Sequence, residues 1–442
     1  MQRSTFLHNS SRQSRTTLII AIVAFVAQLA FAQSESVLYN FGGSSDGSQP
    51  YGGVIADSAG NLYGTTSAGG TANCGTVFEL SPSGGGWTKT TLHSFSRFDG
   101  CAPMQGLVMD SSGNLYGTTR YGGSKTNGSG VVFELQRAAG QWNEITLHKF
   151  IFDGIRQFDG AAPNSTLTFD AKGNLYGTTE FGGKGKCLNI NDLADSTFLP
   201  PKSIPPQGCG MVFELSPNSD GTWAEAVLHD FAGKYDGGLP LSGVVIDSQG
   251  NLYGTASNGG LLWTPNCNSF YDLGCGVVYS LSRGGDGTWT ETVLHKFRGV
   301  FDGANPLGGL TFDGAGNLYG TTASYFYNST VFELSRTSGG SWSERTIYDL
   351  HGSGPWDGVT LDSAGNLYAM TYSGGTNGWG IVLQLTPTPK GWSETVLHDF
   401  ASAPSDGAQP GYGSLLLNNG VLYGTTIYGG TYNSGTVFAV TP

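Results

Sequence analysis

Five histidines occupy the same place in a segment that recurs along the chain, two residues before a phenylalanine. They are His93, His148, His229, His295 and His398. Histidine acts as a general acid or base near neutral pH and is a common metal ligand, so such a series could carry catalysis or metal binding. However, Tyr39 and Tyr348 stand at this position in two further copies. Interchange with tyrosine indicates packing of an amphipathic ring, and no Ser-His-Asp grouping follows from the pattern.

Acidic residues recur in two further patterns. Asp-Gly precedes an apolar segment at Asp46, Asp99, Asp159, Asp236, Asp302, Asp357 and Asp406, and a proline follows three residues after the glycine in six of the seven cases. A ring of aspartates could hold cations or a polar ligand near an axis, but a capped turn explains the repetition better. Glutamates share a second position at Glu79, Glu134, Glu214 and Glu333. Because they fall in separate repeats, they do not supply the paired carboxylates of a glycosidase.

Aromatic residues in the variable loops are candidates for ligand binding. They are Trp263, Phe270, Tyr271, Tyr325 and Tyr327, of which the first three break the repeat and are the best candidates. Aromatic faces with few charges suit sugars, which stack on them, although packing among loops would also explain these residues. Asn189, Asn191, Asp192 and Asp195 offer oxygen ligands suited to Ca²⁺, but they match no ordered Ca²⁺-loop pattern. We therefore predict no cofactor, with Ca²⁺ as the open alternative, and no catalytic residue is identified.

The elements that would position these residues follow from one repeated stretch, Gly-Asn-Leu-Tyr-Gly-Thr, at Gly60, Gly113, Gly173, Gly250 and Gly316. Weaker copies begin at Gly365 and Gly420, which makes seven. Recurrence at about 50 to 80 residues indicates a propeller or another repeat array. Each copy holds four segments with strand signals, A to D, for example A at 105–110, B at 114–119, C at 131–135 and D within 142–150 in the second repeat.

The order of these segments predicts a closed ring. An isolated D segment, 37–41, begins the mature chain, and an A-B-C set without a D segment, 413–442, ends it. This is the permutation that lets the first strand complete the last blade and removes exposed sheet edges. We predict an all-β, seven-bladed propeller of four-stranded antiparallel blades over residues 33–442. The repeats lie near 52–95, 105–150, 166–231, 243–297, 308–350, 357–400 and 413–442 plus 37–41. The long B-C loops of the third and fourth repeats fall on one face.

Six cysteines suggest disulfides within or beside these loops. We predict the pairs Cys187–Cys209 and Cys267–Cys275, and Cys74 can pair with Cys101 because both lie in loops of the same face. Zinc is the rival, but no C-x-x-C pair and no adjacent histidine supports it.

Export is predicted by the N-terminus. Residues 1–32 carry three arginines, an apolar run over 18–27 and the Ala30-Phe31-Ala32 cleavage pattern of a signal peptide. Cleavage would change the formal net charge from −12 to −15, since it removes three arginines and no acid. So acidic a protein is a poor partner for nucleic acid or anionic membranes. We expect a secreted or periplasmic monomer, free of the membrane after cleavage and without a C-terminal anchor, that meets a glycan or an extracellular protein.

The repeat resembles the Gloeo/Verruco-type (GloVer) tandem repeat of secreted bacterial proteins. The resemblance rests on Gly-Asn-Leu-Tyr-Gly-Thr-Thr, Gly-Thr-Val-Phe-Glu-Leu-Ser-Pro at 75–82, the Leu-His-x-Phe segment and Asp-Gly-x-x-Pro, and it extends over 36–442. It implies an exported, propeller-like protein and brings no catalytic residues.

Two functions remain open at this point. The first is a binding protein that recognises a polysaccharide or surface glycan without catalysis. The second is a secreted carbohydrate-active hydrolase or lyase whose site lies on the face with the third and fourth B-C insertions. An enzyme would need a cluster of acids, histidine or tyrosine that breaks the repeat.

Overall fold

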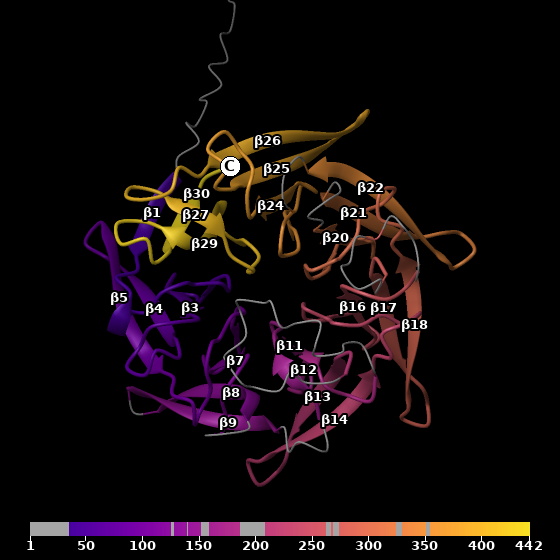
Figure 1. The fold of residues 1–442 in the computed structure, drawn as a ribbon, viewed down its shortest axis with the longest axis horizontal. Helices are drawn as coiled ribbons and strands as arrows, with labels where there is room; N and C mark the ends of the chain where they lie inside the picture. Colours follow the sequence, from indigo (N-terminus) through magenta and orange to yellow (C-terminus); the bar gives the residue numbers. More distant parts are fainter. Residues whose placement is uncertain are drawn as a thin grey trace, which may run out of the picture. The chain divides into compact units, whose positions relative to one another are not determined.

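The computed structural model describes residues 35–124, 128–138, 140–151, 159–185, 208–261, 267, 274–323, 329–350 and 354–442. These residues belong to the unit from Gln33 to Pro442, while the predicted export signal lies outside them. Within this unit, seven antiparallel sheets lie in a ring in the order of the sequence (Figure 1). The prediction of a seven-bladed β-propeller is confirmed.

Each blade runs from a short inner strand to a long outer strand. The blades are as follows: blade 1, β2 (Ile55–Ala56), β3 (Leu62–Thr66), β4 (Thr76–Ser83) and β5 (Gly86–Ser94); blade 2, β6 (Val108–Met109), β7 (Leu115–Thr119), β8 (Gly128–Ala138) and β9 (Gln141–Ile151); blade 3, β11 (Thr168–Phe169), β12 (Leu175–Phe181), β13 (Met211–Pro217) and β14 (Trp223–Asp230), with β10 (Ala161–Pro163) beside β12; blade 4, β15 (Val245–Ile246), β16 (Leu252–Ala256), β17 (Val277–Arg283) and β18 (Trp289–Lys296). The remaining three are blade 5, β19 (Thr311–Phe312), β20 (Leu318–Thr322), β21 (Ser329–Arg336) and β22 (Trp342–Leu350); blade 6, β23 (Thr360–Leu361), β24 (Leu367–Thr371), β25 (Ile381–Thr388) and β26 (Gly391–Asp399); and blade 7, β28 (Leu416–Asn418), β29 (Val421–Gly429), β30 (Thr436–Val440) and β1 (Glu35–Asn40), with β27 (Gly407–Pro410) beside β29.

The N-terminal strand closes the ring as predicted. Strand β1 pairs antiparallel with β30, with Glu35 opposite Val440 and Asn40 opposite Thr436. The last blade therefore takes its outer strand from the start of the chain, and both ends of the propeller are held by one sheet.

The inner strands are shorter than the sequence suggested. In the second repeat, β6 covers two residues, whereas we expected a strand over 105–110. The residues before β6 do not pair within their own blade because the neighbouring blade uses them: Thr65 Oγ1 of β3 donates to the carbonyl oxygen of Gln105 at 3.1 Å. Equivalent bonds join five other pairs of neighbouring blades, from Thr118, Thr178, Thr255, Thr321 and Thr425. These threonine bonds fix how six of the seven inner strands lie against the neighbouring blade.

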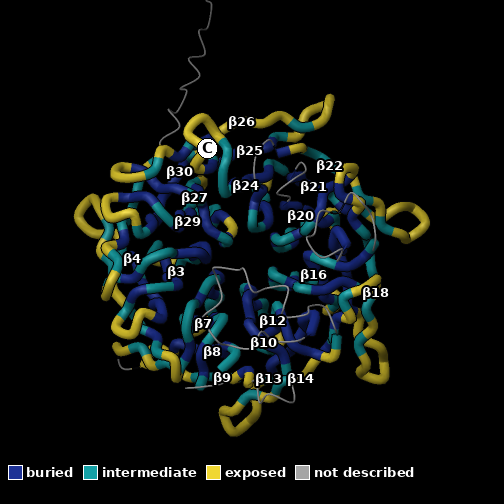
Figure 2. The backbone as a smooth tube through the Cα atoms, viewed as in Figure 1, coloured by how far each residue is buried: buried dark blue, intermediate teal, exposed yellow. Residues whose placement is uncertain are grey.

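The hydrophobic core lies between neighbouring blades. The phenylalanine that ends the outer strand of one blade packs edge-on against an aromatic ring of the third strand of the next, as Phe41 does on Phe78 at a centroid distance of 5.1 Å. The same contact recurs in five other interfaces, at Phe95–Phe133, Phe150–Phe213, Phe231–Tyr279, Phe297–Phe332 and Phe400–Phe438. Figure 2 shows buried residues concentrated in the second and third strands of the blades and exposed residues gathered at the outer hairpins.

The second glycine of Gly-Asn-Leu-Tyr-Gly-Thr makes room for this aromatic layer. A methyl group on Gly64 would lie 2.6 Å from Cζ of Phe78, a contact that real β-carbons essentially never make. In blade 6 the ring is replaced by Leu383, and there the glycine is replaced by Ala369. The glycine of the repeat is therefore a packing residue.

The Asn and Tyr of the same motif hold the turn between the first two strands. In blade 1, Asp57 Oδ1 accepts from the backbone N–H groups of Ala59 and Asn61, and Asp57 Oδ2 accepts from Asn61 Nδ2 and the Tyr63 hydroxyl. The aspartate, asparagine and tyrosine recur in blades 2 to 6 at Asp110, Asp170, Asp247, Asp313 and Asp362. A side chain that satisfies several backbone donors is a structural device at such turns.

Two of the predicted disulfides are present. Cys74 pairs with Cys101 across a Cα–Cα distance of 4.4 Å and joins the first blade to the loop before the second. Cys267 pairs with Cys275 within one loop, at 4.9 Å. Cys209 is also disulfide-bonded, but its predicted partner Cys187 lies outside the described residues. Among the described residues, no helix is long and apolar enough to cross a bilayer.

Substitution of Phe41 tests whether the closing strand is as integral as the others. Phe41 and Phe95 occupy equivalent, fully buried positions, one in the N-terminal strand and one inside the chain. We expect Phe41→Ala and Phe95→Ala each to cost about 3–5 kcal/mol of unfolding free energy, since both leave a large cavity. Urea unfolding of the two variants measures this. A Phe41→Ala protein as stable as the wild type would show that ring closure contributes nothing.

Substitution of Tyr279 tests the packing of the aromatic layer. Tyr279 stands where other blades have phenylalanine, it is fully buried, and its hydroxyl has no hydrogen-bond partner among the described residues. Tyr279→Phe should therefore raise the free energy of unfolding by about 1–3 kcal/mol, because a desolvated and unpaired hydroxyl is removed. The reverse change at an equivalent ring, Phe332→Tyr, should lower the stability, and a gain in both proteins would contradict this reasoning.

Candidate functional site

The recurring histidines and aspartates form pairs at the outer strands, away from the axis. His93 Nε2 lies 3.0 Å from Asp99 Oδ2, and the His93 ring packs edge-on against Phe95. Asp99 also accepts from the backbone N–H of Ser96, so it caps the loop that leads to the next blade. The same pairing recurs at His295–Asp302 and His398–Asp406, and Tyr39 replaces histidine beside Asp46. This agrees with the structural interpretation of both patterns.

Asp357 does not belong to this series, and its assignment to the Asp-Gly ring was wrong. Thr321 Oγ1 donates to the carbonyl oxygen of Asp357 at 2.7 Å, which is the bond that Thr65 makes to Gln105. Asp357 is therefore the counterpart of Gln105, three residues before the inner strand, and not of Asp99. The missing proline after Gly358 reflects this shift, because Pro355 already fills the proline position of the repeat.

The other predicted site residues contribute less. Glu214 accepts a hydrogen bond from the Tyr176 hydroxyl at 3.2 Å, and Glu333 pairs with Arg345 on the neighbouring strand. These glutamates lie within separate blades and form no pair of facing carboxylates. The loop aromatics Trp263, Phe270, Tyr271, Tyr325 and Tyr327 lie outside the described residues, as do Asn189, Asn191, Asp192 and Asp195.

Comparison of the seven blades with one another shows where the repeat breaks down. Within β3 and its counterparts the sequence Leu-Tyr-Gly-Thr hardly varies, but two positions near the axis differ from blade to blade. The first, four residues before the inner strand, holds Tyr51, Met104, Asn164, Leu241, Leu307, Trp356 and Tyr412. The second, two residues after the threonine of the second strand, holds Ser67, Arg120, Glu180, Ser257, Ala323, Tyr372 and Ile427. Residues that the framework does not require are the candidates for function.

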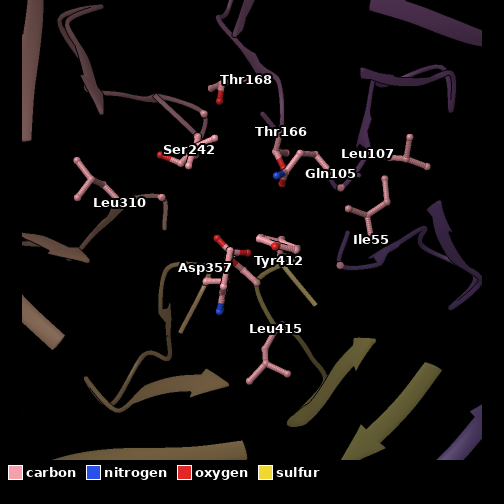
Figure 3. A pocket seen from close by; sticks show the side chains of 18 of the residues that line it. Ile55, Gln105, Leu107, Thr166, Thr168, Ser242, Leu310, Asp357, Tyr412 and Leu415 are labelled. Carbon is pink, nitrogen blue, oxygen red and sulfur yellow. The ribbon is translucent and has the colours of Figure 1, made fainter. Parts of the chain in front are cut away.

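Four residues of the first position, Leu241, Leu307, Trp356 and Tyr412, line an axial cavity of about 300 Å³. All seven blades line the cavity through their inner strands and the residues just before them. Figure 3 shows Asp357 and Tyr412 on one side, facing Gln105, Thr166 and Ser242 across the space. Within the described part of the chain, Asp357 is the only ionisable carboxyl group, and the only charged side chain, that lines it.

Two rings that line the cavity, Trp356 and Tyr412, belong to a cluster of four aromatic residues. Tyr412 packs against Tyr51 at a centroid distance of 5.1 Å and edge-on against Trp356 at 4.7 Å, and Trp356 contacts Tyr372 at 5.6 Å. The four residues come from blades 6, 7 and 1 and are brought together only by the closed ring. We call Tyr51, Trp356, Tyr372 and Tyr412 the aromatic wall.

At the two variable positions, blades 2 and 3 carry the polar residues Arg120, Asn164 and Glu180. Arg120 Nη2 lies 2.7 Å from Glu180 Oε2, and both side chains are largely buried. Burial opposes the charge on Arg120, but the Glu180 carboxylate outweighs it and raises the pKa of Arg120. Burial also raises the pKa of Glu180. We treat the two groups as a charged pair because Arg120 Nη2 and Glu180 Oε2 lie only 2.7 Å apart. Beside this pair, Gln105 Nε2 donates to Asn164 Oδ1 at 3.3 Å, so amide groups complete the polar side.

The Asp357 carboxyl group accepts one hydrogen bond from the backbone of the next residue and one from a serine of the neighbouring blade. The Gly358 N–H donates to Asp357 Oδ1 at 2.6 Å, and Ser414 Oγ donates to Asp357 Oδ2 at 2.9 Å. The Asp357 side chain is half-buried, and part of its surface faces the cavity. Burial therefore raises its pKa, and the hydrogen bonds from Gly358 and Ser414 only partly oppose the shift. A carboxyl group with these properties can accept or donate a hydrogen bond to a ligand.

The sequence contained a signal for this site that the motifs concealed. None of the aromatic wall residues belongs to a motif, and they are separated by up to about 360 residues, since Tyr51 and Tyr412 are neighbours only through ring closure. A column-by-column comparison of the repeats would have identified the two variable positions. The loop aromatics proposed from sequence lie directly downstream of one of them, as Tyr325 follows Ala323.

Fold and site together define a seven-bladed β-propeller with a closed ring and a non-repeating set of side chains around its axial cavity. The chain belongs to the Gloeobacter/Verrucomicrobia repeat family, whose model matches residues 24–191 and 324–442. No curated protein matches it. Similar solved structures include a putative gluconolactonase (14% identity, 93% of this chain and 92% of the other, TM-score 0.41) and a putative 6-phosphogluconolactonase from Bacteroides uniformis (14%, 78% and 83%, 0.46). A third is a protein from Lactobacillus plantarum (13%, 89% of each chain, 0.45).

Substitution of Asp357 tests its place in the cavity. Because burial raises its pKa in the folded protein, the wild type loses stability as the pH rises from the unfolded pKa through the folded one. Asp357→Asn removes this loss, so we expect a gain of about 0.5–2 kcal/mol at pH 7 that disappears near pH 3. Urea unfolding as a function of pH measures it.

Asp57 provides a control of opposite sign. Burial favours its neutral form, but the hydrogen bonds from Asn61 and its neighbours outweigh this and lower its pKa. Asp57→Asn should therefore destabilise the protein at pH 7, with a loss that shrinks as the pH falls. The same pH trend in both variants would contradict the assignment of Asp357 to the cavity.

Proposed function

We propose that this protein is an exported binding protein that recognises a carbohydrate in its axial cavity, without catalysis. The observation that carries the proposal is one cavity lined on one side by the rings of Trp356 and Tyr412 and the Asp357 carboxyl group, with the Gln105 amide across the space. Sugars present apolar C–H faces and hydroxyl groups, and they are recognised by aromatic rings together with carboxyl and amide groups.

The charges favour a neutral glycan. The only charged side chain among the described residues that line the cavity is an acid, and the nearby Arg120 is already paired with Glu180. An anionic sugar in the cavity would lie near the acidic Asp357. No lysine or arginine stands among the described residues that line the cavity to balance its charge. The cavity of about 300 Å³ lies at the lower end of the usual range for ligand sites, which suits a chain end or a short oligosaccharide.

Binding without catalysis is supported by the carboxyl groups themselves. Hydrolysis of a glycosidic bond generally requires two carboxyl groups that flank the bond, and the described cavity lining offers one. The alternative, a secreted carbohydrate-active hydrolase or lyase, would place its acids in the third and fourth B-C insertions, which lie largely outside the described residues.

Export is part of the proposal. Disulfides such as Cys74–Cys101 form in oxidising compartments, and the N-terminal sequence has the pattern of a cleaved signal peptide. We propose a secreted or periplasmic monomer that meets its glycan outside the cytoplasm.

A glycan-array and polysaccharide pull-down screen of residues 33–442, followed by calorimetric titration of the best ligand, tests the proposal. Trp356→Ala and Tyr412→Ala should each weaken binding about tenfold or more, because each removes a stacking surface worth roughly 1.4 kcal/mol or more. Tyr235→Ala, which removes a 64% exposed ring outside the cavity, is the control and should bind as the wild type does.

Reducing-sugar release is assayed on every ligand found. Release would overturn the non-catalytic function and favour the hydrolase. Binding that survives Trp356→Ala and Tyr412→Ala but is lost in Trp263→Ala would move the site to the B-C loops. Absence of any glycan binding would reject the carbohydrate proposal and leave a protein partner.

A further inference from the structure

A second cluster of functional groups recurs far from the cavity, where the outer strands of neighbouring blades meet. It combines the His–Asp pair of one blade interface with a glutamate from the next outer strand, four residues before the histidine position of that strand. The five sets are His93/Asp99/Glu144, His148/Asp159/Glu225, His229/Asp236/Glu291, His295/Asp302/Glu344 and His398/Asp406/Glu35. In the last two sets the ligand atoms all lie within 4.8 Å of one another.

The interface between blades 7 and 1 already contains a cation at this place. There the glutamate is replaced by Lys89, whose Nζ lies 2.8 Å from Asp46 Oδ1 and also donates to the Asp46 carbonyl oxygen. The Lys89 side chain is only 4% exposed, so its ammonium group sits inside the interface. Where lysine takes the place of glutamate, Tyr39 also takes the place of histidine, and no metal-binding set remains. The position is therefore one that accommodates a buried positive charge.

Several of the glutamate sets contain buried polar atoms that lack a hydrogen-bond partner among the described residues. They are Glu35 Oε1, Glu225 Oε1, Glu291 Oε1, His148 Nε2 and His229 Nε2. Buried oxygen and nitrogen atoms rarely remain unpaired, because desolvation without a partner is costly. In the set of Glu35, His398 and Asp406 the unpaired atom is Glu35 Oε1, and an electropositive partner would satisfy it.

The set at Glu35, His398 and Asp406 is the most suitable of the five. In the set of His295, Asp302 and Glu344, Arg298 Nε already pairs with Asp302 at 3.0 Å. In the described part of the chain, no lysine or arginine forms an ion pair with Glu35 or Asp406. His398 Nε2 lies 3.0 Å from Asp406 Oδ2, and Asp406 is fixed by the backbone N–H groups of Ala401 and Gly407. The His398 and Asp406 side chains are thus held in position by protein contacts, without a metal ion.

We propose that Glu35, His398 and Asp406 bind a divalent transition-metal ion, with Zn²⁺ as the best fit, and that this ion ties the N-terminal strand to blade 6. One imidazole nitrogen and two carboxylate oxygens are ligands of the kind that Zn²⁺ takes, and water completes the coordination. Glu35 is the first residue of β1, the strand that closes the propeller. The ion would join blades 6 and 7 in the way that the Lys89 ammonium group, paired with Asp46, joins blades 7 and 1.

The experiment uses tag-free residues 33–442, stripped of metal with a chelator and then titrated with Zn²⁺ alone by equilibrium dialysis and by thermal unfolding. The wild type should bind Zn²⁺ in a saturable way and unfold at a higher temperature with it, because a ligand of the folded state stabilises that state. Glu35→Gln and His398→Gln should each bind one equivalent less. Glu394→Gln is the matched control, since Glu394 holds the same strand position but contacts the Tyr348 hydroxyl at 2.7 Å, in an interface without the histidine.

A further variant copies the solution that the chain itself uses at Lys89. Glu35→Lys should unfold in the absence of metal at a temperature at or above that of the metal-free wild type, and it should bind one equivalent of Zn²⁺ less. Absence of saturable Zn²⁺ binding by the wild type would overturn the proposal and leave a shared proton in the cluster. Equal loss in Glu35→Gln and Glu394→Gln, or no loss in either, would also overturn the assignment to this set.

Discussion

The architecture depends on the contact between a glycine of the second strand of each blade and an aromatic ring of its third strand. A methyl group at Gly64, Gly117, Gly177, Gly254, Gly320 or Gly424 would come within about 2.7 Å of that ring. With the glycine present, the ring lies deep enough in the sheet to receive the phenylalanine of the preceding blade edge-on, and this contact builds the core between blades. The sixth blade supports the explanation, since Ala369 and Leu383 change together there. One steric requirement thus accounts for the most regular feature of the sequence.

The regular framework leaves the axial cavity free to vary. Threonine bonds such as Thr321 to the Asp357 carbonyl fix the backbone just before six of the seven inner strands, so the backbone there does not depend on which side chain it carries. This explains how seven nearly identical blades present tyrosine, tryptophan, aspartate, glutamine and asparagine around one axis. Closure by β1 is equally necessary, because it brings Tyr51 of blade 1 against Tyr412 of blade 7.

The sequence predicted the fold well and the site poorly, for different physical reasons. Strand periodicity, the Gly-Asn turn and the isolated outer strand at 37–41 are local or repeated features, and they were sufficient for the seven blades and their closure. The Cys74–Cys101 and Cys267–Cys275 pairs followed from loop positions. The inner strands were overestimated because the threonine bonds that compete for their backbone come from another blade. The sequence misassigns Asp357 because its Asp-Gly dipeptide has the same letters as the turn motif but lies six residues out of register with it. The aromatic wall depends on contacts between residues far apart in the chain, which no motif records.

A structure of residues 33–442 with the tightest-binding oligosaccharide bound is the most direct test of the central claim, that the axial cavity is the binding site. We expect a sugar ring stacked on Tyr412 or Trp356, with a hydroxyl group within hydrogen-bond distance of the Asp357 carboxyl group. A sugar bound only on the B-C loops around Trp263 and Tyr271, with the cavity unoccupied, would contradict it.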